Sequence, residues 1–269
     1  MCRRGFAAAI TGIILTFAGS AQAKIQTKNI QYQHENTKMR GFLAYDDSIK
    51  GPRAAVIVVH EWWGQNDYAR QRARQLAELG YAAFAIDMYG DGKSTEHPKE
   101  AGAFAQAALA NLDEAEQRFQ AAMNVLTELE QVDQKKIAAI GYCFGGGVVL
   151  HMARRGLPLK GVVSFHGSLS SQKRAEPGEV KAQVLVLHGE EDHMISSQSI
   201  ADLAVEMTLA APSFEFIAYP GAAHSFTNPA ADEIAKKFDM PVAYHQEADQ
   251  QSWQKMQEFL TRVFAQTSH

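Results

Sequence analysis

Hydrophobic residues along the chain fall into short continuous runs that alternate with longer segments of helical composition. The runs are rich in valine, isoleucine and alanine and show no polar alternation, which is typical of strands buried on both faces of a parallel sheet. Two earlier segments, 24–33 and 39–45, alternate in polarity and predict a hairpin-type entry to the sheet. The buried strands are predicted at 54–60, 81–87, 136–141, 161–165, 184–188 and 214–219.

The segments between these runs predict helices that cover the sheet. The segment 99–130 is rich in alanine, leucine, glutamate and glutamine and predicts one long helix or two consecutive ones. The polar stretch 168–179 predicts a surface loop. Alternation of strands and helices indicates an α/β fold, with a mostly parallel sheet and helices on both faces. The helices are predicted at 67–79, 99–130, 145–155, 198–209 and 244–264.

The first 23 residues have the composition of a secretory signal peptide. Arg3 and Arg4 form a basic start, residues 6–17 are mostly apolar, and Ala-Gln-Ala at 21–23 matches a cleavage site. The apolar stretch is short for a membrane span, and an uncleaved N-terminal anchor is the alternative. We therefore predict a mature chain at 24–269, folded as one domain and exported across the inner membrane to the periplasm.

Charge and hydropathy argue against two kinds of partner. Cleavage would remove two arginines and no acids, so the formal charge at pH 7 would change from −4 to −6. No basic stripe is present, which argues against a nucleic-acid partner. No later apolar segment is long enough to span a bilayer. We expect a monomer or homodimer without stable membrane insertion after cleavage.

Cys143 would be the one cysteine of the mature chain, because Cys2 belongs to the predicted signal peptide. Without an intramolecular partner in an oxidising compartment, it is either a buried apolar residue or a working thiol. It lies in Gly141-Tyr-Cys-Phe-Gly145, the cysteine form of the G-x-S-x-G nucleophile elbow, between a predicted strand and helix. The two glycines permit a strained turn, and the helix N-terminus favours a thiolate.

A glycine-rich corner of this kind could also hold a phosphate group. No lysine follows it, however, and the sequence has no G-x-G-x-x-G. The stretch Gly92-Lys93-Ser94 imitates the end of a P-loop, but the required first glycine falls at Asp87. We therefore reject a nucleotide site and expect no cofactor.

A nucleophile needs a base, and the base needs an orienting group. In hydrolases with this elbow the chain order is nucleophile, acid, histidine. Asp192 follows a buried strand and is preferred over Glu190 and Glu191, which read as solvated loop charges. His224 follows the last predicted strand and comes after the acid, so it is the candidate base.

The other histidines have simpler interpretations. His166 follows a strand but precedes the acid, so we place it in the substrate pocket. His188 and His193 are expected to make local hydrogen bonds, and His151 belongs to the helix after the elbow. The histidines and acids of 188–193 crowd one turn and lack H-E-x-x-H spacing, so we expect no metal.

The first buried strand leads into the motif HEWWG at 60–64. The loop after this strand usually supplies the second N–H of an oxyanion hole, beside that of the residue after the nucleophile. The predicted donors are the amides of Trp62 and Phe144. Glu61 is unusual, because a carboxylate here would face the thiol. A glutamate of a surface loop is the alternative interpretation.

Together these motifs resemble the dienelactone hydrolase family, an α/β-hydrolase branch with a Cys-His-Asp triad. The resemblance spans almost the whole mature chain and rests on HEWWG, YAAFAIDMYG, GYCFGGG, LHGEEDH and GAAHSF. It implies an α/β-hydrolase fold with Cys143 as nucleophile, His224 as base and Asp192 as the partner of the base. It also implies that Glu61 contacts the resting thiol and helps to take its proton when substrate arrives.

The chain departs from that family at two positions. In enzymes that open dienelactones, two arginines bind the substrate carboxylate, and their places here look like Asp91 and Asn228. Neither can clamp a carboxylate, and Asp91 would repel one. Together with Trp62, the aromatic residues Trp63 and Tyr89 indicate a pocket for neutral, partly apolar groups, although such residues also serve in packing.

We therefore predict a hydrolase that cleaves small esters or lactones through a cysteine thioester. A non-catalytic protein that binds a hydrophobic metabolite or a partner in the same pocket is the alternative. A redox thiol ranks lowest, because no second cysteine is available to resolve a sulfenate.

Overall fold

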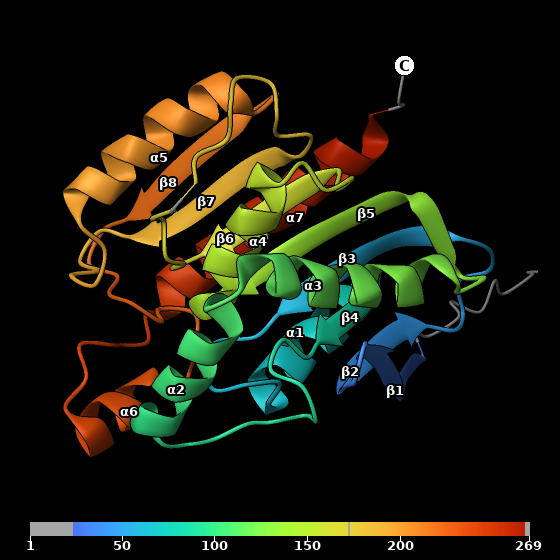
Figure 1. Cartoon of the computed structure of the whole chain (residues 1–269), viewed down its shortest axis with the longest axis horizontal. Helices are drawn as coiled ribbons and strands as arrows, with labels where there is room; N and C mark the ends of the chain where they lie inside the picture. Colours follow the sequence, from blue (N-terminus) through green and yellow to red (C-terminus); the bar gives the residue numbers. More distant parts are fainter. Residues whose placement is uncertain (1–23, 172, 267–269) are drawn as a thin grey trace, which may run out of the picture.

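The computed structural model describes residues 24–171 and 173–266, so the predicted signal peptide at 1–23 lies outside the described residues (Figure 1). The strands are β1 (Ile25–His34), β2 (Thr37–Asp46), β3 (Arg53–Val59), β4 (Ala82–Ile86), β5 (Val132–Tyr142), β6 (Gly161–Phe165), β7 (Gln183–Gly189) and β8 (Phe214–Tyr219). The helices are α1 (Asp67–Glu78), α2 (Pro98–Leu109), α3 (Leu112–Thr127), α4 (Phe144–Arg154), α5 (Ser197–Ala210), α6 (Ala231–Phe238) and α7 (Gln246–Ala265).

The strands form one sheet in the order β1-β2-β4-β3-β5-β6-β7-β8. The pairs β1–β2 and β2–β4 are antiparallel, which confirms the predicted hairpin entry, and every later pair is parallel. Because the parallel strands run in one direction, their carboxyl ends meet at one edge of the sheet, where loops and helix N-termini converge.

The central strands of the sheet are buried on both faces, as the continuous apolar runs indicate. On β3, Ile57 belongs to the core that includes Phe119 of α3, whereas its neighbour Val58 belongs to the core that includes Leu76 of α1 and Phe259 of α7. Successive residues of a strand point to opposite faces, so a strand between two layers of helices needs apolar residues at every position. The predicted α/β architecture is confirmed.

The structure resolves the segment 99–130 into the helices α2 and α3. The break occurs at Asn111, whose side-chain oxygen accepts a hydrogen bond of 3.2 Å from the backbone N–H of Glu114 and caps α3. Helix α6 was not predicted. It is short and only half of its residues are apolar, and its ring contact between Phe238 and His97, 5.5 Å between centroids, places it beside the start of α2 (Figure 1).

Within residues 24–171 and 173–266, no helix combines the length and the hydropathy needed to cross a bilayer. The described residues of the predicted loop 168–179 form neither helix nor strand, which agrees with the sequence.

Candidate active site

Cys143 lies between the last residue of β5 and the first residue of α4. Its backbone has φ 52° and ψ −114°, a conformation that non-glycine residues rarely adopt and that stores strain at functional sites. The Cys143 N–H donates to the carbonyl oxygen of Phe165 at 3.0 Å, which extends the ladder between β5 and β6 as far as the nucleophile. The corner therefore has the geometry of a nucleophile elbow.

The glycines around Cys143 are required by backbone contacts. A Cβ atom on Gly141 would lie 2.0 Å from the carbonyl oxygen of Gly145, and one on Gly145 would lie 2.3 Å from that of Val59. Gly146 is also tight, since its Cβ would lie 2.7 Å from the Cα of Gly167. Any side chain at these positions would push the elbow away from the sheet, as the spacing predicts.

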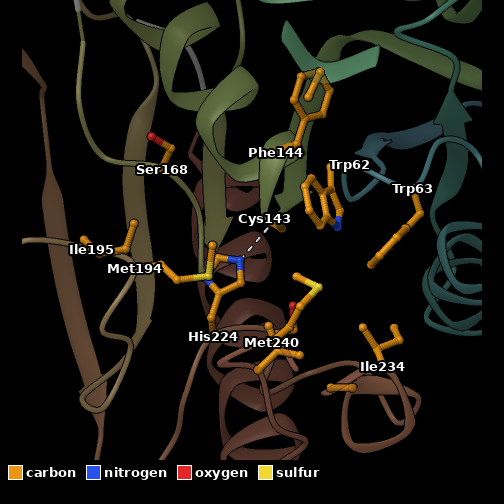
Figure 2. A pocket seen from close by; sticks show the side chains of 14 residues that line it. Trp62, Trp63, Cys143, Phe144, Ser168, Met194, Ile195, His224, Ile234 and Met240 are labelled. Carbon is orange, nitrogen blue, oxygen red and sulfur yellow. Dashed lines mark hydrogen bonds between the residues drawn. The ribbon is translucent and has the colours of Figure 1, made fainter. Parts of the chain in front are cut away.

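The structure brings Cys143, His224 and Asp192 together from three separate loops. The Sγ of Cys143 lies 3.2 Å from Nε2 of His224, a contact drawn in Figure 2, and Nδ1 of the same ring lies 2.8 Å from Oδ2 of Asp192. The Asp192 side chain is fully buried, and its Oδ1 accepts a hydrogen bond from the backbone N–H of Met194 at 3.0 Å. A carboxylate held in this way fixes the orientation of the imidazole.

Charge stabilises the protonated form of His224. Burial by itself would lower its pKa, but the negative charge of the Cys143 thiolate and the hydrogen bond to Asp192 outweigh burial and raise the pKa to about 10. The raised pKa favours a His224 ring that holds a proton beside sulfur, the candidate nucleophile of the pair.

A cavity of about 300 Å³ opens over the thiol. In Figure 2 the rings of Trp62 and Trp63 stand on one side of the thiol, with Met194 and Ile195 on the other. The described residues that line the cavity include no lysine, arginine, aspartate or glutamate. Such a lining favours neutral and apolar substrate groups.

The two predicted oxyanion donors border this cavity with Cys143. Phe144 is the first residue of α4, and the first N–H groups of a helix have no partner within the helix. The backbone of Trp62 is held by a hydrogen bond, because the hydroxyl of Tyr89 donates to its carbonyl oxygen at 3.0 Å. Both residues thus border the same cavity as the thiol, and their amides stay the predicted donors to the oxygen of an attacked carbonyl.

Comparison with known proteins identifies the family of the chain. The model of the dienelactone hydrolase family matches residues 39–264. The chain belongs to this family. A dienelactone hydrolase-like promiscuous phosphotriesterase from metagenomic libraries has 33% sequence identity and a TM-score of 0.84, over 89% of this chain and 99% of its own. The fold is that of the α/β-hydrolases, and the family implies a small-molecule substrate.

Two further proteins are more distant. A Saccharolobus solfataricus protein named "Putative carboxymethylenebutenolidase" is 28% identical over 270 residues, which cover 88% of this chain and 98% of that protein. The crystal structure of dienelactone hydrolase from Anabaena variabilis has 22% identity and a TM-score of 0.58, over 79% of this chain and 94% of its own. At that identity the second comparison supports the fold alone.

Glu61 is buried, with 2% of its surface exposed, so the interpretation as a surface glutamate is wrong. Its contact with the resting thiol, which the family resemblance implies, stays a prediction. Its Oε2 accepts from the side-chain amide of Asn228 at 2.6 Å and its Oε1 accepts from the hydroxyl of Ser225 at 3.3 Å, while the thiol is paired with His224. Burial raises the pKa of Glu61, and the Asn228 bond acts against that rise.

Of the three residues predicted for the substrate pocket, the structure places one there. Trp63 lines the cavity, whereas Tyr89 and His166 are buried and do not line it. Tyr89 is turned inward because Asp87 curls the loop after β4, accepting from the backbone N–H groups of Tyr89 at 2.9 Å and Gly90 at 2.8 Å. His166 is turned away from the cavity toward the hydroxyl of Thr227.

The remaining candidates lie outside the site. Asp91 is exposed and Asn228 is buried against Glu61, and neither lines the cavity. His188 was expected to make local hydrogen bonds, but its Nδ1 is buried without a partner, so that expectation is wrong for this atom. In the described part of the chain no group of three or more histidine, cysteine, aspartate or glutamate side chains could hold a metal ion.

Proposed function

We propose that this family member hydrolyses small neutral esters or lactones through a thioester on Cys143. The observation that carries the proposal is the pairing of its thiol with His224 and of His224 with Asp192, at a cavity whose lining includes no lysine, arginine, aspartate or glutamate. Nucleophile, base and orienting acid in mutual hydrogen bonds are the minimal set for acyl transfer.

In the first half-reaction the Cys143 thiolate attacks the ester carbonyl. The N–H groups of Phe144 and Trp62 bind the oxyanion, a contribution worth on the order of 10²–10³ in rate for one donor. When the tetrahedral intermediate collapses, the C–O bond breaks and the His224 imidazolium gives its proton to the departing alkoxide. The product alcohol of an open-chain ester is released while the acyl group stays on sulfur. When a lactone opens, the new hydroxyl remains part of the acyl group on sulfur.

In the second half-reaction the neutral His224 takes a proton from water, which attacks the thioester carbonyl. The C–S bond then breaks and the carboxylic acid leaves, which regenerates the thiolate and the imidazolium. Esters are favoured over amides, because a thiolate is a better leaving group than an amine and the tetrahedral adduct of an amide would return to reactants.

Neutral substrates are favoured over carboxylate-bearing ones. The cavity offers aromatic and aliphatic contacts, and its lining includes no lysine or arginine that could clamp a carboxylate. A neutral aryl phosphotriester is a second candidate substrate, supported by the phosphotriesterase name of the relative with a TM-score of 0.84 and by the same lining.

The test compares a neutral aryl ester, its carboxylate-bearing analogue and a neutral aryl phosphotriester. We expect turnover of the neutral ester, with kcat/KM lower for the charged one, and losses of about 10³-fold or more in Cys143→Ala and His224→Ala without a change in Tm. Full activity in either variant would overturn the mechanism. Stable labelling of Cys143 without turnover of any ester would favour the binding protein instead.

Export to the periplasm is part of the proposal and rests on the composition of residues 1–23. Fractionation of cells that express the full chain, followed by N-terminal sequencing, should find protein that begins at Lys24 in the periplasmic fraction. Protein that retains Met1 in the cytoplasmic fraction would contradict it.

A further inference from the structure

His166 is fully buried at the carboxyl end of β6, beneath the reacting pair and outside the cavity. Its backbone continues the sheet, since its N–H donates to the carbonyl oxygen of Leu187 at 2.8 Å. Its φ of 38° is positive, so the chain turns at this residue and directs the ring back toward the elbow. The proposed mechanism assigns this imidazole no role.

The hydrogen bonds of the ring define its tautomer. The backbone N–H of Cys143, which also reaches Phe165, donates to Nδ1 of His166 at 3.2 Å. Nδ1 must therefore carry a lone pair, and the proton of the neutral ring is on Nε2. Nε2 lies 2.7 Å from Oγ1 of Thr227, so this N–H donates to the threonine hydroxyl.

Thr227 is itself fixed by a buried network. The hydroxyl of Tyr68 lies 2.7 Å from Oγ1 of Thr227, and the guanidinium of Arg72 donates to the Thr227 carbonyl at 2.7 Å and to the Tyr68 oxygen at 3.3 Å. Arg72 is a donor only, so both oxygens accept from it. Asp249 pairs with the guanidinium at 2.5 Å and balances its charge.

The same imidazole touches the catalytic base. The ring of His166 packs against that of His224 with centroids 5.3 Å apart and planes at 65°, and against Phe226 with centroids 5.3 Å apart and planes at 79°. One side chain thus joins the end of β6, the backbone of the nucleophile and the loop that carries the base.

We propose that His166, held as the neutral Nε2–H tautomer by Thr227, is a positioning residue that fixes the Cys143 backbone and the His224 ring relative to each other. A protonated His166 would turn a second N–H toward that of Cys143, and the contact would break. The surroundings oppose protonation, since burial and the nearby charge of His224 lower the pKa of His166 well below its ordinary value. The kinetic part of this proposal rests on the proposed ester hydrolysis.

The tautomer can be measured without substrate, by ¹⁵N NMR of the histidine side chains in the intact protein. We expect His166 to show protonated Nε2 and bare Nδ1, unchanged between about pH 6 and 9, a range in which ordinary histidines titrate. Assignment comes from the loss of the signal in His166→Asn. A His166 that titrates in this range, or that carries its proton on Nδ1, would overturn the proposal.

The kinetic test uses two pairs of variants. His166→Asn retains an acceptor near the place of Nδ1 and tolerates positive φ, whereas His166→Ala removes both ring contacts. Thr227→Val removes the hydroxyl that accepts from Nε2, whereas Thr227→Ser retains it. We expect kcat on a neutral ester to fall about 10²-fold in His166→Ala and about 10-fold in Thr227→Val, with KM within about threefold, because a misplaced reacting pair loses rate without losing binding. In His166→Asn and Thr227→Ser, kcat should return most of the way to the wild-type value.

The rate of Cys143 alkylation by iodoacetamide separates this proposal from the proposed function. Its pH profile should move to higher pH in His166→Ala and Thr227→Val, by about half a unit or more, because the displaced imidazolium stabilises the thiolate less. That shift would support the positioning role even if the wild-type protein hydrolysed no ester. The Thr227 pair decides the question if His166→Ala does not fold. An unshifted alkylation profile together with wild-type kcat in folded Thr227→Val would overturn the proposal.

Discussion

The side-chain amide of Asn228 donates a hydrogen bond of 2.6 Å to the buried carboxylate of Glu61. These residues come from the loop after β3 and the loop that follows the catalytic histidine, so the bond ties together the two segments that flank the reacting pair. The family resemblance implies that enzymes that open dienelactones carry a substrate-binding arginine at the place that looks like Asn228. In this chain the position serves an internal carboxylate.

Removal of the Asn228 amide should therefore destabilise the protein. In Asn228→Ala the Glu61 carboxylate keeps the weaker bond from Ser225, and loss of one donor to a buried charged group costs about 1–3 kcal/mol. Urea unfolding at about pH 8 measures this cost. Glu61→Gln is the matched control, since its amide can still accept from Asn228 and donate to Ser225. Equal stability of Asn228→Ala and the wild type would contradict the assignment.

Glu61 should also make stability depend on pH. Burial raises its pKa above the ordinary 4.5, so in that range the folded state binds more protons than the unfolded state. Its contribution to stability is then lost as the pH rises from about 4.5 through the folded pKa. Unfolding free energies between about pH 5 and 8 should fall less in Glu61→Gln than in the wild type. Parallel curves for the two proteins would exclude this source of pH dependence.

The elbow predicts a sharp difference between two neighbouring glycines. A Cβ on Gly145 would lie 2.3 Å from the backbone oxygen of Val59, whereas one on Gly147 would lie 3.3 Å from the Cβ of Ser168. Gly145→Ala should cost about 2 kcal/mol or more and remove activity, while Gly147→Ala should stay within about 1 kcal/mol of the wild type, because helix propensity offsets the tighter contact. Comparable Tm values for the two variants would count against the elbow geometry.

The raised pKa of His224 should depend on the thiolate. In Cys143→Ala the opposing effect of burial remains while the largest of the raising effects, the charge of the thiolate, is gone, so the His224 pKa should fall from about 10 by at least about one unit. NMR titration of the ring measures it directly, with Asp192→Asn as the comparison. A value that stays near 10 in Cys143→Ala would show that Asp192 alone holds the proton.

Because no lysine or arginine lines the cavity, one added cation should change substrate preference. Met194 lines the cavity and is 51% exposed, so a longer polar side chain can be accommodated there. Met194→Arg should raise kcat/KM for a carboxylate-bearing ester relative to its neutral analogue by about tenfold at low salt, and less at high salt. Met194→Gln is the uncharged control. The same preference in both variants would mean that the cavity charge does not select substrates.

The triad could be predicted from the sequence because each member lies at or shortly after the end of a strand that is recognisable as a short apolar run. Cys143 also carries a local signal, the flanking glycines, whose cause is a backbone contact within the same corner. The acid and the base then follow from chain order. Parallel strands bring their carboxyl ends to one edge, so the assembly of these three residues needed no knowledge of side-chain packing.

The polar contacts around the triad could not be predicted in the same way. Glu61 and Asn228 are 167 positions apart, and His166 and Thr227 are 61 apart. Nothing local in the sequence pairs them. Tyr89 was predicted to line the pocket as an aromatic residue near a strand end. The buried Asp87 side chain, however, accepts hydrogen bonds from the backbone N–H groups of Tyr89 and Gly90, and the Tyr89 side chain is turned into the core. Such outcomes depend on how loops fold over one another.

The central claim is that the acyl group passes through the sulfur of Cys143. Rapid quenching of the wild-type protein with a slowly hydrolysed neutral ester, followed by intact-mass and peptide analysis, tests it most directly. We predict that one acyl group replaces the thiol hydrogen on the peptide that contains Cys143, forms no later than the alcohol product, and disappears as the acid is released. Product formation at full rate with no acylated Cys143, and equal turnover by Cys143→Ala, would contradict the account.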